Sequence, residues 1–170
     1  MEPLSVKCEV RFKKAPDFGR PHDSNGDNFY EITLNVMDDA GLSDSQSITI
    51  QVVDVDERPI LTSHDGNAWT SFEIPENASA VTTVSATDDD LGTILIFSIS
   101  GGADKSKFRV DESSGALRFL QTPDYETPDD NGTNNVYEVV VRVSDGKLTV
   151  EQALSVKVTD VTTFGWMWHG

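Results

Sequence analysis

The chain has 170 residues, enough for one or two small domains. It carries 29 acidic and 13 basic side chains, a formal net charge of −16, which argues against direct binding of nucleic acids or anionic membranes. No run approaches the roughly 18 apolar residues of a membrane span, and the single cysteine, Cys8, rules out a disulfide framework. The charge alone leaves open a cation partner or simply the acidic surface of a secreted protein.

Apolar and polar residues alternate with a period of two along much of the chain, and no segment has an apolar stripe at helical spacing. Such alternation, enriched in β-branched residues, predicts half-buried strands. Turn sequences rich in Asp, Asn and Gly separate the runs, as in an antiparallel β-sandwich. In chain order the predicted strands are 30–36, 47–52, 70–74, 79–86, 93–100, 107–110, 136–143 and 148–158.

The sequence also repeats itself. Residues 12–38 align with residues 119–145 at a constant offset of 107, and ten of the 27 aligned positions are identical. A period of this length is the size of one sandwich domain, so the repeat indicates an array of modules.

The two copies differ in what precedes them, because the first has only 11 residues ahead of its repeated half and the second has about 60. We therefore predict an incomplete module at 1–55, with the closing strands only, a complete module at 56–162, and an aromatic tail or the start of a downstream segment at 163–170. We expect the chain to be part of a longer array. The open edge of the incomplete module predicts either disorder or pairing with another chain, including a dimer.

Acidic side chains gather where the predicted sandwich places its loops. Calcium takes six to eight oxygen ligands at about 2.3–2.6 Å, and several loops must converge to supply them. Any one acidic loop is more simply a solvated turn, so only the whole set indicates a metal site. The acidic positions are 54–57, 88–90, Asp145, Glu76, 124–126 and Asp17.

An ordered series of short motifs resembles the cadherin repeat, especially the bacterial cadherin-like kind. The motifs are Pro75-Glu-Asn77, Ala86-Thr-Asp-Asp-Asp-Leu-Gly92, Phe108-Arg-Val-Asp with Gly115, Asp124-Tyr-Glu126 and Val141-x-Val-x-Asp145. Each is weak alone, but the series is specific and covers residues 12–161. The resemblance implies an all-β, seven-stranded Greek-key sandwich, related to the immunoglobulin fold, with calcium held between consecutive domains.

The same resemblance implies calcium ligands residue by residue. The linker 54–59 matches the family motif Asp-x-Asn-Asp-Asn-x-Pro, which places Asp56 and Glu57 at side-chain ligand positions. Asp17 matches the first acidic ligand at the base of the preceding domain. The ligands implied at the top of the following domain are Asp88, Asp90 and Asp145. The weaker set implied at its far end is Glu76, Asp124 and Glu126.

Three departures from the family pattern weaken some of these positions. Gly19 stands where the family has a glutamate, and Arg58 replaces a neutral asparagine and brings a positive charge toward the ions. The segment that follows Asp160 has no acid at the positions of Asp56 and Glu57. We therefore expect one good site, with weak neighbouring sites and an empty or partly hydrated far end. The good site is expected to consist of Asp56, Asp88, Asp90 and Asp145.

The predicted function is that of a calcium-binding adhesive or structural module, not an enzyme, in a cell-surface or secreted protein. Calcium would rigidify the joint between modules. The partner would be another protein, including a homophilic one, or a cell-surface polysaccharide, with membrane contact only through the parent protein. The alternative is a carbohydrate-binding module that uses a sandwich face or the aromatic tail. The second module has few aromatic residues outside predicted core positions, which disfavours this alternative.

Overall fold

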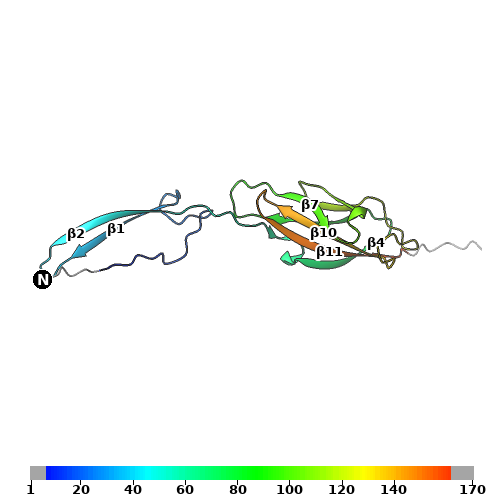
Figure 1. Cartoon of the computed structure of the whole chain (residues 1–170), viewed down its shortest axis with the longest axis horizontal. Coiled ribbons are helices and arrows are strands. Elements are labelled where there is room, and N and C mark those ends of the chain that lie inside the picture. The colour runs from blue at the N-terminus through cyan, green and yellow to red at the C-terminus, as the bar shows by residue number, and fades with distance from the viewer. Residues whose placement is uncertain (1–6, 162–170) are drawn as a thin grey trace, which may run out of the picture. The chain divides into compact units, whose positions relative to one another are not determined.

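The computed structural model describes residues 7–161 and divides the chain into two compact units, Met1–Val55 and Asp56–Gly170 (Figure 1). Regular structure in the described residues consists of β-strands and two single turns of 3-10 helix. No helix in this part of the chain is long and apolar enough to cross a membrane. The predicted tail at 163–170 and the last residue of the predicted module, Thr162, lie outside the described residues.

The first unit contains one antiparallel hairpin, formed by β1 (Phe29–Met37) and β2 (Ser43–Gln51). Asp38 closes the turn, because its Oδ1 accepts the backbone N–H groups of Ala40 (2.9 Å) and Leu42 (2.8 Å). Gly41 has a φ of 85°, a conformation that favours glycine. The described residues ahead of the hairpin, 7–28, form no strand.

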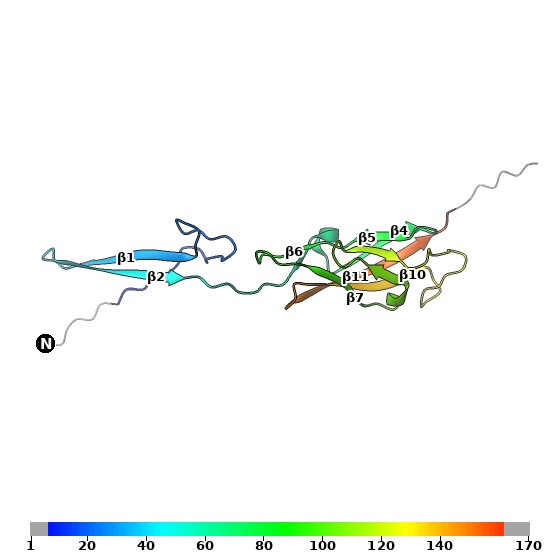
Figure 2. The ribbon, with the colours of Figure 1, turned by 90° about the horizontal axis from the view of Figure 1, so that it is seen from above.

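The second unit is a sandwich, shown from two directions in Figures 1 and 2. One sheet has the order β4-β11-β10-β7, the other has the order β5-β9-β8, and β3 pairs with β6. Strand β4 runs parallel to β11, and the other pairs are antiparallel. The strands are β3 (Ile60–Leu61), β4 (Trp69–Pro75), β5 (Ala80–Thr83), β6 (Ala86–Thr87), β7 (Ile96–Gly101), β8 (Phe108–Val110), β9 (Ala116–Phe119), β10 (Val136–Ser144) and β11 (Thr149–Thr159), with 3-10 turns η1 (Ser63–Gly66) and η2 (Lys105–Lys107).

Several predicted strands differ from the observed ones. Strand β2 begins at Ser43, not at residue 47, and β3 and β9 were not predicted. The run 79–86, predicted as one strand, is two strands, because the chain leaves β9 after Thr83 and pairs with β3 at Ala86. Val84 lies between the two strands and is fully buried. Its N–H donates to the carbonyl of Gly115 (3.0 Å). Strand β7 begins at Ile96, not at residue 93, because the preceding residues belong to a loop in which Ile94 is 78% exposed.

The alternation of apolar and polar residues along the strands determines which side chains form the core of the second unit. Alternate residues of β10 are 0–2% exposed, and alternate residues of β11 pack beside them. Phe108 and Phe119 stack at a centroid distance of 4.4 Å, and Phe119 meets the edge of Tyr137 at 5.0 Å. Full burial of each such side chain contributes about 1.5–3 kcal/mol. The buried apolar side chains of the two strands are Tyr137, Val139, Val141, Val143, Leu154, Val156 and Val158.

The internal repeat reappears as repeated contacts. Phe12 meets Tyr30 at 5.0 Å with an interplanar angle of 86°, as Phe119 meets Tyr137 at 5.0 Å and 81°. The tyrosine hydroxyl in each copy accepts a backbone N–H eight residues earlier, at 3.1 and 3.2 Å. The environments differ, however, since Phe12 is 41% exposed and Phe119 is 3% exposed. The first unit therefore reproduces the local contacts of the second without its core.

Candidate metal centre

Three segments of the second unit bring acidic side chains to one end of its sandwich. They are the entry segment 56–59, the loop that follows β6, and the turn between β10 and β11. Figure 2 shows the loop after β6 and the β10–β11 turn at the same end of this unit. Hydrogen bonds and an ion pair join the three segments.

The loop after β6 carries two half-buried carboxylates. Asp88 and Asp90 are half-buried, whereas Asp89 between them is exposed. Asp88 Oδ1 accepts the backbone N–H of Asp90 (2.9 Å), which fixes the turn. Asp90 Oδ2 in turn accepts the backbone N–H of Glu57 (3.2 Å), and the carboxylate oxygens of Glu57 and Asp90 lie within 4.8 Å of each other.

Asp145 holds the turn between β10 and β11. Its Oδ1 accepts the backbone N–H groups of Lys147 and Leu148, both at 2.6 Å, and Gly146 between them has a φ of 102°. The hydrogen bond from the Lys147 N–H lowers the pKa of Asp145, because it stabilises the charged form. Asp145 is thus a fixed carboxylate anion at neutral pH.

A lysine side chain contacts this cluster. The ammonium group of Lys147 forms an ion pair with Asp56 Oδ1, and that hydrogen bond raises the pKa of Lys147. The charges of Asp90 and Asp145 raise it further. Lys147 was not among the predicted site residues, although it follows a predicted ligand in the sequence Asp145-Gly146-Lys147.

Asp88 and Asp145 each have a carboxylate oxygen that accepts no hydrogen bond from the described residues. Asp88 Oδ2 and Asp145 Oδ2 each have less than 1 Å² of accessible surface and no donor. Buried polar atoms are nearly always hydrogen-bonded, and a buried carboxylate oxygen without a partner is costly. A hard cation prefers such oxygens as ligands, so this donor set matches the chemistry of calcium.

The predicted ligands of the good site therefore gather at one end of the second unit. Asp17 belongs to the first unit, where its Oδ1 accepts the backbone N–H of Arg20 (3.0 Å). The residues brought together are Asp56, Glu57, Asp88, Asp90 and Asp145.

A second acidic group lies around Glu76, which is 9% exposed. Oxygens of Glu76, Glu126 and Asp160 lie within 4.8 Å of one another. Asp160 was not predicted as a ligand. Asp124 is not in this group, and its Oδ1 accepts the backbone N–H groups of Glu126 and Thr127. Both Glu76 oxygens accept backbone N–H groups, from Tyr125 (3.2 Å) and Val161 (3.0 Å). Because the Glu76 oxygens already accept hydrogen bonds, we expect this group to bind a metal ion more weakly than the Asp88–Asp145 end.

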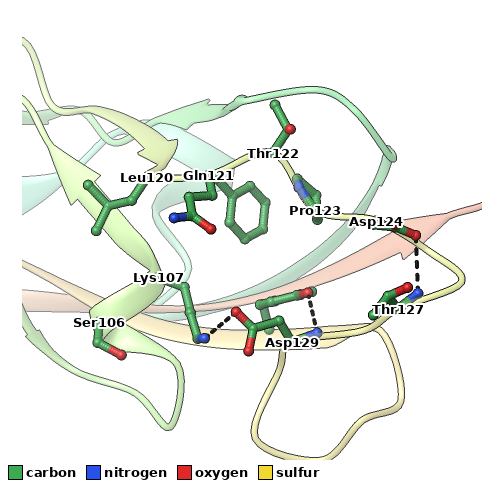
Figure 3. A pocket seen from close by; sticks show the side chains of 11 residues that line it. Ser106, Lys107, Leu120, Gln121, Thr122, Pro123, Asp124, Thr127 and Asp129 are labelled. Atoms are coloured by element: carbon green, nitrogen blue, oxygen red, sulfur yellow. Dashed lines mark hydrogen bonds and ion pairs between the residues drawn. The ribbon is translucent and has the colours of Figure 1, made fainter.

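A hollow of about 500 Å³ lies between the segment after β9 and the segment that leads into β10 (Figure 3). Lys107 and Asp129 form an ion pair at this hollow, and the hydroxyl of Tyr137 accepts the N–H of Asp129 (3.2 Å). The aromatic rings of the lining, Phe119 and Tyr137, are 3% and 2% exposed. Neither offers an open face for stacking on a sugar, so the hollow lends no support to the carbohydrate alternative, which stays a prediction.

The fold and the acidic end define a class of sandwich modules, and comparison with known proteins identifies the family. The family model of the cadherin domain matches residues 70–159. Human protocadherin-23 is 31% identical over 122 residues, and mouse protocadherin Fat 2 is 29% identical over 148 residues, which is 71% and 82% of this chain. The chain spans 3% of the length of each of these relatives.

Solved structures show the same fold. Mouse cadherin-23 EC22-24 superposes with a TM-score of 0.59 at 24% identity, over 83% of this chain and 45% of that one. Human protocadherin-24 EC1-2 gives a TM-score of 0.58 at 20% identity, over 87% of this chain and 70% of that one. The chain belongs to the cadherin family, and the predicted sandwich is confirmed. Cadherin domains are non-enzymatic modules of adhesion proteins, so this chain is not an enzyme.

Replacing Asp88 by asparagine tests whether the clustered carboxylates repel one another. Asparagine keeps an oxygen that accepts the Asp90 N–H, so the turn survives while one negative charge is lost. With a chelator present, we expect Asp88→Asn to raise the melting temperature by roughly 2–5 °C, the shift from about 1 kcal/mol in a domain of this size. Thermal unfolding followed by circular dichroism measures this.

The control is Glu138→Gln, which removes the same charge from an exposed position at the other end of β10. It should change the melting temperature far less. The gain from Asp88→Asn should also shrink in high salt, because salt screens charge repulsion. A lower melting temperature for Asp88→Asn in chelator would contradict repulsion in the cluster.

Proposed function

We propose that the second unit binds calcium at its Asp88–Asp145 end and serves as a calcium-stiffened adhesive or structural module of an extracellular protein. The observation that carries the proposal is the pair of buried oxygens without hydrogen-bond donors, Asp88 Oδ2 and Asp145 Oδ2. Membership in the cadherin family supports it, since cadherin domains generally bind calcium.

Charge explains why an ion would bind and which ion it would be. Several carboxylates held within a few ångström of one another repel unless a cation compensates them. Calcium tolerates six to eight oxygen ligands in flexible geometry, whereas magnesium demands a near-octahedral shell and gives up its water reluctantly. Extracellular modules of this chemistry bind calcium with a Kd of about 0.1–1 mM, which is the range proposed for this end.

The position of the site at the entry to the second unit suggests its mechanical role. Asp56 and Glu57 lie next to the boundary between the two units, at Val55 and Asp56. An ion held by them and by the loops of the second unit would restrict rotation of this linker. The relatives belong to families of cell-surface cadherins, which supports an extracellular location and a protein partner.

The first unit supplies a candidate surface for self-association, which we define as the open face of β1: Tyr30, Ile32, Leu34 and Val36. The equivalent residues of β10 are 0–2% exposed, whereas Val36 is 64% exposed and the other three are half-buried. We propose that a second copy of the chain covers this face, because identical apolar faces are self-complementary about a two-fold axis. One protein of similar fold, protocadherin gammaB7, is described as a cis-dimer of its domains EC3-6.

Calorimetry of the whole chain tests the calcium proposal. Wild type should release or absorb heat on titration with calcium, with a Kd in the proposed range of about 0.1–1 mM, and its melting temperature should rise in calcium. Asp90→Ala should lose both effects, because it removes a carboxylate that faces Glu57. Asp89→Ala removes the exposed neighbouring carboxylate and should keep both. No heat and no thermal shift for wild type at several millimolar calcium would contradict the proposal.

Sedimentation velocity tests the open face. Wild type should sediment as a dimer at tens of micromolar, and Leu34→Asp should sediment as a monomer, because a charge then lies in the apolar contact. Asn35→Asp introduces the same charge on the exposed side of β1 and should leave the dimer intact. A monomeric wild type at this concentration would rule out self-association through the open face.

A further inference from the structure

The ammonium group of Lys147 lies among the acidic side chains that calcium would contact. It pairs with Asp56 Oδ1, and the charges of Asp90 and Asp145 also act on it. The Lys147 side chain is 73% exposed and that of Asp56 is 30% exposed. The cation therefore reaches the cluster from the solvent side on a long, flexible stem.

The turn that carries Lys147 also carries one of the proposed calcium ligands. Asp145 Oδ1 holds the backbone N–H groups of Lys147 and Leu148, so the ligand itself fixes the point from which the lysine stem starts. Asp145 Oδ2 is buried and has no donor, although the lysine is only two residues away. The ammonium thus neutralises Asp56 and leaves oxygens deeper in the cluster without a partner.

We propose that Lys147 is a built-in counter-cation, which neutralises part of the cluster when calcium is absent and is displaced when calcium binds. The inference rests on the proposed calcium function and adds a determinant of its affinity. Bound calcium and a nearby ammonium repel each other, so part of the binding free energy of calcium is used to move the lysine away. Lysine suits this exchange, because its single charged group on a four-carbon stem turns to solvent readily.

The proposal makes opposite predictions for the two states. Without calcium, the ammonium lessens carboxylate repulsion, so its removal should destabilise the fold. With calcium bound, the ammonium repels the ion, so its removal should strengthen binding. A lysine that only packs against the turn or braces it would not produce this reversal.

Titration of the whole chain with calcium chloride tests the proposal, comparing wild type with Lys147→Gln and Lys147→Arg. We expect Lys147→Gln to bind calcium about two- to fivefold more tightly, the range for an exposed charge pair. Lys147→Arg keeps the charge and should bind no more tightly than wild type. In chelator, Lys147→Gln should melt at a lower temperature than wild type, and this deficit should disappear in saturating calcium.

The matched control is Lys157→Gln. Lys157 pairs with Glu73 Oε1 (2.8 Å) near the opposite end of β11, so this variant makes the same change in net charge away from the cluster. Its calcium affinity should equal that of wild type. If wild type binds calcium and Lys147→Gln binds it equally or less tightly, the proposed role of Lys147 is wrong, but the proposed calcium site is not contradicted. If no variant binds calcium, the proposed function fails, and this inference with it.

Discussion

Backbone hydrogen bonds that hold carboxylates in place are the constraint on which the acidic end depends. One oxygen of Asp88, one of Asp90 and one of Asp145 each accept a backbone N–H, from Asp90, Glu57 and Lys147 respectively. A side chain that rotated away from its acidic neighbours would give up its hydrogen bond and leave a backbone N–H without an acceptor. Repulsion in the cluster is therefore relieved by a cation more readily than by movement, and Lys147 provides part of that relief.

The two units show how one local pattern gives different burial in different surroundings. The offset of 107 is conserved in aromatic contacts and in the hydrogen bond to each tyrosine hydroxyl. Val141 of β10 is fully buried because strands from both sheets surround it, whereas Leu34, its equivalent on β1, is half-buried. The repeated segment forms its local contacts by itself. A buried core also requires the opposing sheet, which the second unit has.

The sequence predicted what depends on local periodicity and on short motifs. Alternation predicted the hairpin strands β1, β2, β10 and β11, and the motif series predicted the cadherin sandwich, whereas β3 and β9 were not predicted. It failed where pairing between distant segments decides the structure: the break after Thr83 arises because β6 pairs with β3. Lys147 and Asp160 were missed for the same reason, since Lys147 meets Asp56 across 91 residues and no spacing rule predicts such a contact. The clustered aspartates were found through the family motif, and their backbone hydrogen bonds became evident only in three dimensions.

Crystals of the whole chain grown in millimolar calcium, with anomalous diffraction data, would reveal whether calcium binds at the Asp88–Asp145 end. We expect an ion bound by Asp88 Oδ2 and Asp145 Oδ2, with the Lys147 ammonium turned away from Asp56. Calcium–oxygen distances of about 2.3–2.6 Å would identify the ion. Those two oxygens bonded to water alone, with Lys147 still paired to Asp56 in saturating calcium, would contradict this expectation.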